Sequence, residues 1–331
     1  LVFTIFSFYS DLPIYANLDF SQWYADIYSV KLGAPLYDET AHQKAVEGLN
    51  IVSPGVTLLP PAYPAPYFAL LYPLTWFTPT TASRIWGAIN FLFALYALIW
   101  MTQRIRFVPR TALIVLLLAS APVYGQMVIG QLSLTLLFAI TLIARSFYDR
   151  NALHGGIGLG LLTLKPHLGI PIFLGVLLWL IRWHPNTIPS LLRSTLCILF
   201  GLFALGMLLD PFWITNYFES LRRLSALPIN QVCDTCSSLS LGISSLFSVS
   251  GDALWGIRIS IALLAYLLIA LLVTNKAAHK YSIEFVLSIL TLLTLIGAPY
   301  VRNYDYALMV YPLGVAIDAL LKLHSRDIIP Y

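Results

Sequence analysis

Long runs of apolar residues follow one another along this chain, and short polar segments separate them. A bilayer core requires about 20 mostly apolar residues for each helix that crosses it. The runs therefore predict an all-α polytopic membrane protein with about ten transmembrane helices, the first of them surviving only as a remnant in residues 1–10. Several runs are shorter than 20 residues, which indicates tilt, local thinning of the bilayer, or helices that stop at a cavity. The other predicted spans are 84–103, 111–126, 132–146, 153–164, 168–181, 194–209, 254–274, 282–299 and 304–321.

The composition excludes a soluble enzyme. Hydrophobic residues make up 59% of the 331 residues and charged residues only 10%, whereas an ordinary soluble domain has about 25% charged residues. If the remnant helix leads outward, one side of the membrane receives most of the basic residues, and the positive-inside rule makes that side cytoplasmic. These residues are Arg104, Arg106, Arg110, Arg145, Arg150, Arg182, Arg193, Lys276, Lys280, Lys322 and Arg326. We therefore expect an integral protein of the plasma (inner) membrane.

The whole of residues 1–331 is expected to form one integral membrane domain with two long extracytoplasmic loops. The first loop is 11–83 and the second is 210–253; transmembrane helices occupy 84–209 and 254–321. Within the first loop, residues 63–77 are apolar but contain Pro64, Pro66 and Pro73. Proline interrupts helices, so this stretch is interpreted as interfacial or re-entrant. In the second loop, Cys233 and Cys236 indicate a small disulfide or two free thiols rather than a metal site.

Residues 17–28 predict an amphipathic helix at the membrane surface, which Asn17 can cap. Asp19, Trp23 and Asp26 fall on one face of this helix. Asp19 has two interpretations. It is a carboxylate stabilised by the helix N-terminus at the protein surface, or it is a general base that faces a cavity.

Several motifs in order along the chain resemble glycosyltransferase family 87, a family of polyprenol-phosphate-mannose-dependent α-mannosyltransferases with the GT-C membrane fold. The resemblance extends from about residue 11 to residue 321. It implies a GT-C fold with a large first extracytoplasmic loop that carries interfacial helices. The motifs are Asp19-Phe20 followed by Tyr24, Gly33-x-Pro35-Leu36-Tyr37-Asp38, a proline-rich stretch, Arg84-Ile85-Trp86-x-x-x-Asn90, Gly130-Gln131-Leu132-Ser133-Leu134, Leu164-Lys165-Pro166-His167 and Tyr304-Asp305-Tyr306.

The resemblance implies an inverting transfer of a hexose, most often mannose, from a polyprenyl-phosphate sugar to a lipid-linked or glycan acceptor. In GT-C enzymes an aspartate of the first outer loop is the general base, and Asp19 is the matching position. Asp26, two turns further on, is the second catalytic candidate. The Asp-x-Asp motif of metal-dependent enzymes that use nucleotide sugars does not occur, so we expect no metal, no other cofactor and no nucleotide-sugar donor. The expected partners are the donor, the acceptor and membrane lipids, and no nucleic acid.

The departing phosphate requires cations in a water-poor site, and an ionisable residue near membrane depth is a functional candidate because it is costly to place there. Lys165 is the first candidate for the phosphate site; the alternative is a lysine that reaches the headgroups. Arg84, Arg302 and His167 are further candidates, with ordinary headgroup contacts for the arginines and a structural role for the histidine as alternatives. The candidates for sugar or acceptor contacts are Gln131, Asp305, Tyr24 and Tyr63.

Two other functions fit a chain with many apolar helices. A transporter or flippase of a lipid-linked glycan is one, but it requires a site at the midplane that is reached from both sides, and this chain concentrates acid, proline and tyrosine in one loop. An O-antigen ligase or polymerase is the other, for which an arginine-rich outer loop is more typical. The second loop, with Trp213, Tyr217, Arg222, Arg223, Asn230 and Gln231, suits a carbohydrate acceptor or an amphipathic interfacial helix.

Overall fold

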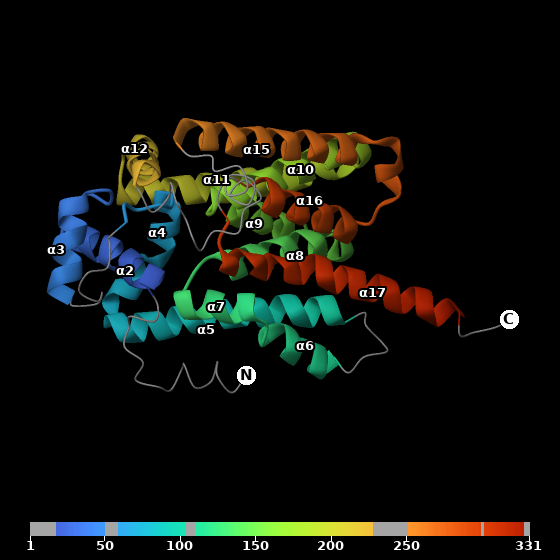
Figure 1. The fold of residues 1–331 in the computed structure, drawn as a ribbon, viewed down its shortest axis with the longest axis horizontal. Helices are drawn as coiled ribbons and strands as arrows, with labels where there is room; N and C mark the ends of the chain where they lie inside the picture. The colour runs from blue at the N-terminus through green and yellow to red at the C-terminus, as the bar shows by residue number, and fades with distance from the viewer. Residues whose placement is uncertain (1–17, 50–58, 104–109, 228–250, 299–300, 328–331) are drawn as a thin grey trace. The chain divides into compact units, whose positions relative to one another are not determined.

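The computed structural model describes residues 18–49, 59–103, 110–227, 251–298 and 301–327. Regular secondary structure in these ranges is helical throughout, in the order drawn in Figure 1. The predictions for residues 1–10, Asn17, Asn230, Gln231 and the pair Cys233 and Cys236 lie outside the described residues. The chain divides into two compact units.

The first unit comprises residues 1–91, 125–132 and 197–234. It contains α2 (Leu18–Lys31), α3 (Glu39–Leu49), α4 (Ala65–Leu71), η2 (Tyr72–Trp76) and α12 (Trp213–Ala226). The helix expected at 17–28 is present as α2, but it is buried on more than one side, because α3, α4 and η2 all pack against it. Both Phe20 and Asp26 are only 1% exposed. Parts of α5 (Pro79–Thr102), α7 (Ala121–Ile129) and α11 (Ile188–Leu209) complete the unit.

The proline-rich stretch forms two short helices. Pro64 is the N-cap residue of α4, a proline occupies the first turn of α4, and another occupies the first turn of η2. Proline fits the first helical turn, where its missing N–H leaves no hydrogen bond unmade. The prediction that residues 63–77 do not form one long helix is therefore confirmed. Their interfacial or re-entrant position relative to a membrane stays a prediction.

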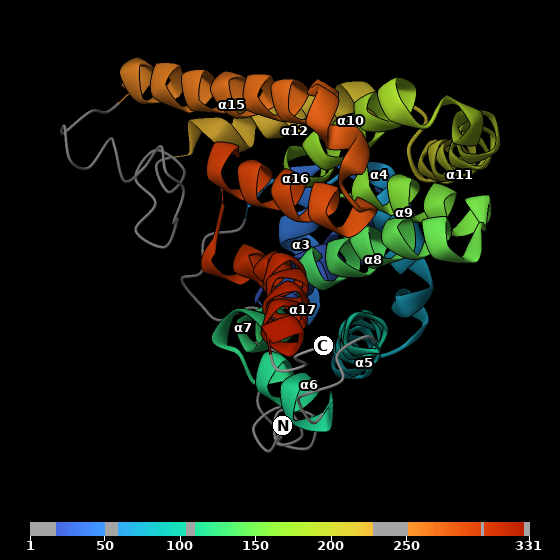
Figure 2. The same ribbon diagram turned by 90° about the vertical axis from the view of Figure 1, so that its right-hand side faces the viewer.

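The second unit comprises residues 92–124, 133–196 and 235–331. Its helices are α6 (Arg110–Leu118), α8 (Ser133–Asp149), α9 (Ala152–Leu162), α10 (Pro166–Trp183), η3 (Pro185–Thr187), α15 (Gly251–Thr274), η4 (Lys276–Lys280), α16 (Ile283–Gly297), η5 (Asn303–Met309) and α17 (Val310–Asp327). Figure 2 shows α8 beside α9 and α16. A Cβ atom on Gly158 of α9 would lie 2.6 Å from the carbonyl oxygen of Ala139 in α8. Glycine thus permits the close backbone approach that is common between membrane helices.

Four helical segments in the described residues are long and apolar enough to cross a bilayer: α5, α10, α11 together with η3, and the part of α15 from Gly256. α6 and α7 make a fifth if the 54° bend between them lies within one span; the sequence predicted one span over 111–126 and did not indicate a bend. Pro122 lies in the first turn of α7, where the straight helix would need its missing N–H. These spans support a polytopic membrane protein, and the larger number of about ten stays a prediction.

Candidate active site

A hydrogen-bonded chain of three side chains fixes the carboxylate of Asp19 in the first unit. Asp19 lies in the first turn of α2 and is partly exposed. The side-chain amide of Gln131 donates a hydrogen bond to this carboxylate, and the hydroxyl of Tyr63 donates one to Oε1 of Gln131 at 2.6 Å. A primary amide held at its oxygen has its N–H₂ group aimed in a fixed direction. The structure therefore brings together three residues that the sequence proposed, from positions 68 and 112 residues apart.

The turn at Gly130 sets the position of Gln131. Gly130 has φ +79°, and a Cβ atom there would lie 2.8 Å from Cβ of Phe20 on α2. Its carbonyl oxygen accepts a hydrogen bond of 2.6 Å from Nε1 of Trp86. Only glycine adopts such a backbone conformation at this close approach without strain. The Gly130 turn thus lies directly against the start of α2.

Aromatic rings surround this cluster. The ring of Trp23 packs edge-on against the rings of Tyr63 and Tyr67, with 5.0 Å between ring centroids in each pair. The ring centroids of Tyr67 and Trp86 lie 6.3 Å apart. Burial, and next the neighbouring Tyr63 and Asp19, raise the pKa of Tyr67 well above its usual value, so its hydroxyl keeps its proton. Aromatic rings combined with polar tips are suited to a ligand that has both apolar and hydroxyl surfaces.

Three buried side chains near these residues have polar atoms for which the described residues supply no hydrogen bond. These atoms are the hydroxyl of Tyr67, Oδ1 of Asn90, and both the oxygen and the nitrogen of the Gln126 amide. Buried polar groups are nearly always hydrogen-bonded in folded proteins. The groups are therefore available to a polar ligand or to water.

Asp26 lies seven residues after Asp19 on α2, but in a different environment. Its carboxylate contacts Nδ1 of His42, which comes from α3, and both side chains are at least 97% buried. Asp38 caps α3 by accepting hydrogen bonds from the backbone N–H groups of Thr40 and Ala41, which fixes the helix that carries His42. Burial alone would lower the pKa of His42, but the charge of Asp26 and the hydrogen bond to it outweigh burial and raise the pKa. Within the part of the chain that the structure describes, the side-chain hydrogen bond of Asp26 is to His42, whose role the sequence did not predict.

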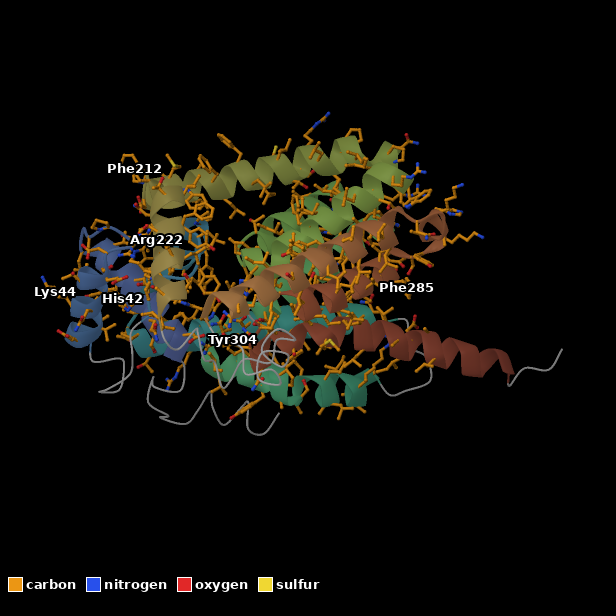
Figure 3. The ribbon with its side chains drawn as sticks, turned by 45° about the horizontal axis from the view of Figure 1, so that its top comes forward. His42, Lys44, Phe212, Arg222, Phe285 and Tyr304 are labelled. Atoms are coloured by element: carbon orange, nitrogen blue, oxygen red, sulfur yellow. The ribbon has the colours of Figure 1, made fainter. Side chains whose placement is uncertain are left out.

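A second polar cluster lies in the second unit, around Lys165. Its Nζ lies 2.5 Å from Oδ1 of Asp305 and 3.3 Å from Oγ of Ser133, and 5.2 Å from the ring centroid of Tyr304, which Figure 3 labels. Ser133 also donates to Asp305 at 2.6 Å. Lys165 is 1% exposed and Asp305 is 1% exposed. Two residues predicted for different ligand groups, phosphate and sugar, thus form one buried ion pair.

The remaining candidates lie in several places, and two of them, Arg302 and His167, are near the Lys165 cluster. The hydroxyl of Tyr24 donates to the carbonyl oxygen of Phe77 at 2.7 Å. Arg84 is exposed on α5. The backbone N–H of Arg302 donates to Oδ2 of Asp305 at 3.1 Å, so Arg302 adjoins the Lys165 cluster through its main chain. His167 lies in the first turn of α10, and its Nε2 has no hydrogen-bond partner among the described residues.

A comparison with models of known protein families identifies the class of this protein. The family model described as Glycosyltransferase family 87 matches residues 62–299, more than two thirds of the chain. The chain belongs to glycosyltransferase family 87. No curated protein and no solved structure matches it.

Membership in glycosyltransferase family 87 makes this protein a membrane glycosyltransferase, with a sugar donor, an acceptor and a lipid environment. The match contains Tyr63, Gln131 and Lys165, but it begins after Asp19 and ends before Asp305. The family match therefore covers the partners of the two carboxylates and leaves the carboxylates to be argued from geometry.

The sequence pointed to Asp19, Gln131 and Tyr63 as separate candidates and did not indicate their contact. It indicated Tyr67 only as one of the tyrosines that anchor the proline-rich stretch in the headgroup region or contact a lipid or sugar. It gave no separate role to Ser133, although Ser133 belongs to the motif that begins at Gly130. Its place immediately after that turn, at the start of the predicted apolar span 132–146, was the one available signal for a polar function.

Proposed function

We propose that this protein is an inverting glycosyltransferase that moves a hexose, with mannose as the first candidate, from a polyprenyl-phosphate donor to a lipid-linked or glycan acceptor. The reaction takes place on the extracytoplasmic face of the plasma (inner) membrane, and Asp19 is the general base. The observation that carries this proposal is the partly exposed carboxylate of Asp19, oriented by the amide of Gln131, which Tyr63 holds in turn.

The carboxylate of Asp19 takes the proton from an acceptor hydroxyl while the hydroxyl oxygen attacks the anomeric carbon of the donor. The bond between that carbon and the phosphate oxygen breaks, and polyprenyl phosphate leaves with the bonding electrons. One displacement inverts the anomeric configuration. The hydrogen bond from Gln131 fixes the direction of the carboxylate, and a positioned base typically contributes about 10²- to 10⁴-fold to the rate.

The environment of Asp26 supports Asp19 as the base. A general base must come within hydrogen-bond distance of the hydroxyl it deprotonates. Asp26 is 1% exposed and its carboxylate already contacts His42. Asp19 is the carboxylate of α2 that a substrate reaches directly.

Lys165 is proposed to interact with the donor phosphate. Its ammonium group is oriented by Asp305 and Ser133, and a cation held in a buried site stabilises developing negative charge more strongly than one in water. Arg84, Arg302 and His167 remain secondary candidates for the same phosphate. In the sequence, only Leu132 separates Gln131, which contacts the proposed base, from Ser133, which contacts the proposed phosphate ligand.

The proposal is tested by transfer of radiolabelled mannose from polyprenyl-phosphate mannose to lipid extracts of the source membranes. The purified wild type is compared with Asp19→Asn and with Asp149→Asn, an exposed carboxylate of α8 that pairs with Arg145. We expect transfer by the wild type and by Asp149→Asn, and a loss of about 10²- to 10⁴-fold in Asp19→Asn without a change in unfolding temperature.

Each outcome of this experiment has a defined meaning. Activity that survives in Asp19→Asn removes Asp19 from the role of base and keeps the class. Failure of the wild type with mannose leads to a panel of other polyprenyl-phosphate sugars, and failure across the panel overturns the proposed donor class.

A further inference from the structure

A cavity of about 330 Å³ lies in the first unit, outside the Asp19 cluster. It is lined by α3, by the chain immediately before the proline-rich stretch, and by the end of α12. Its lining residues are Glu39, His42, Gln43, Leu59, Pro60, Arg223, Ala226 and Leu227. Figure 3 shows His42 on the inner side of α3 and Lys44 pointing away from it. The size is at the lower end of the range of small-molecule sites.

Two nitrogen atoms of residues lining this cavity have no hydrogen-bond partner among the described residues. One is Nε2 of His42, on the ring edge opposite the Nδ1 that contacts Asp26, and His42 is 3% exposed. The other is Nε of Arg223. The guanidinium of Arg223 is held by the carbonyl oxygen of Tyr37 at 3.3 Å and by Oε1 of Glu39 at 3.3 Å. Both side chains are thus fixed while one nitrogen of each is left without a partner in the described part of the chain. Nε of Arg223 donates a hydrogen bond, and Nε2 of His42 donates one when the ring is protonated and accepts one when it is neutral, so the hydroxyl groups of a ligand would satisfy both.

The charges around the cavity are balanced. Asp26 lies against His42, and Glu39 lies against Arg223. An isolated anion would gain little from such a site, because each cation already has a carboxylate partner. Hydroxyl groups both donate and accept. A neutral ligand with several of them gains hydrogen bonds from Nε of Arg223, with Nε2 of His42 in either protonation state, and to the carboxylate acceptor.

The rest of the lining is apolar and is contributed by Leu59, Pro60, Ala226 and Leu227. A sugar ring presents hydroxyl groups along its edge and C–H groups on its faces. Polar groups that fix orientation beside an apolar surface are the usual composition of a small-molecule site. The lining therefore matches one sugar residue better than a phosphate or a lipid chain.

We propose that this cavity binds one neutral sugar residue of the acceptor, with Nε of Arg223 donating a hydrogen bond to one of its hydroxyl groups, Nε2 of His42 hydrogen-bonded to another, and Asp26 acting as the positioning residue for His42. This inference rests on the proposed function in that the acceptor carries a sugar. The cavity is an acceptor subsite distinct from the Asp19 cluster. It gives the second loop, through Arg223 of α12, a role in choosing the acceptor.

Binding is measured by saturation-transfer difference NMR on the full detergent-solubilised chain, with methyl α-D-mannopyranoside as the probe. Arg223→Met removes one donor, and Ala226→Phe fills the cavity without disturbing the buried pair of Asp26 and His42. Arg222→Met is the matched control, because Arg222 is the neighbouring arginine, is highly exposed and pairs with Glu219. We expect about a tenfold weaker apparent affinity in Arg223→Met, since a hydrogen bond from a charged donor is lost. We also expect loss of the signal in Ala226→Phe and no change in Arg222→Met.

Asp19→Asn and inorganic phosphate separate the two proposals. The probe signal is expected to survive in Asp19→Asn, and phosphate is expected not to compete with it. A cavity-dependent signal in a protein that shows no sugar transfer keeps this inference and rejects the proposed function. A wild type without a signal, a signal that persists in both cavity variants, or a signal that phosphate displaces overturns the assignment of the cavity to a sugar, whatever the transfer assay shows.

Discussion

The cluster around Asp19 and the cluster around Lys165 are both built on a carboxylate, but they treat its charge differently. Asp19 is partly exposed at the start of a helix and accepts a hydrogen bond from the neutral amide of Gln131. Asp305 is fully buried and lies 2.5 Å from the ammonium of Lys165. Burying a charge is costly unless it is paired and hydrogen-bonded. The comparison supports the proposal that Asp19 accepts a proton, whereas the carboxylate of Asp305 is held in a buried ion pair within its own unit.

The largest expected effect is the loss of stability when the buried ion pair of Lys165 and Asp305 is broken. Asp305→Ala leaves the ammonium of Lys165 buried without its carboxylate, and breaking a buried pair in this way costs about 3–5 kcal/mol in the free energy of unfolding. The double variant Lys165→Met with Asp305→Leu removes both charges and is expected to regain most of this loss. Unfolding in detergent micelles measures both. If Asp305→Ala is as stable as Asp19→Asn, the distinction between the two clusters is wrong.

The next prediction concerns the support of Asp19. Gln131→Leu removes the amide that donates to the carboxylate, and a hydrogen bond to a charged group contributes about 1.5–3 kcal/mol, so turnover falls about 10- to 100-fold. Tyr63→Phe removes only the neutral hydroxyl bond and has a smaller effect in the same direction. Steady-state transfer rates measure both effects, with the exposed Gln103→Leu as the control. Equal rates in Gln131→Leu and the wild type would show that the amide does not orient the base.

The turn that places Gln131 gives a smaller effect. Gly130→Ala introduces a Cβ atom at φ +79° and 2.8 Å from Phe20, which costs about 1–2 kcal/mol and shifts the turn away from α2. Transfer activity is expected to fall together with stability. Gly201→Ala in α11 is the control, since no atom lies within 4 Å of the added methyl group and alanine favours a helix over glycine by about 0.5–1 kcal/mol. A Gly130→Ala variant that matches this control contradicts the close approach.

The smallest effect is a pH dependence from the pair of Asp26 and His42. The pKa of His42 is raised in the folded protein, so its contribution to stability is complete below the unfolded pKa of about 6.5 and is lost as the pH rises through the folded value. The charged groups around His42 are Asp26 from α2, Glu39 from α3 and Arg223 from α12, and burial raises the pKa of Asp26. We expect the unfolding temperature of the wild type to fall over this range, and Asp26→Asn to flatten the profile. A wild-type profile as flat as that of the variant would reject the raised pKa.

Local patterns in the sequence determined much of the helical framework. The prolines around residue 66 predicted that no long helix forms there. The structure has two short helices instead, α4 and η2, each with a proline in its first turn. The bend between α6 and α7 was missed, because one proline in an apolar run does not show on which side of it the helix restarts. The burial of α2 on several sides was also missed, since α3, α4 and η2 lie further along the chain and hydrophobic periodicity reports only the helix itself.

The sequence by itself determined that the chain is a helical membrane protein, which of its few polar residues are candidates for chemistry, and, through its motifs, its family. Only the tertiary structure decided which of those residues meet. Gln131 reaches Asp19 across 112 residues, Lys165 reaches Asp305 across 140, and Asp26 is covered by His42. The physical reason is that apolar periodicity and proline act over a few residues of one helix. Hydrogen bonds and ion pairs between helices depend instead on packing that no single segment encodes.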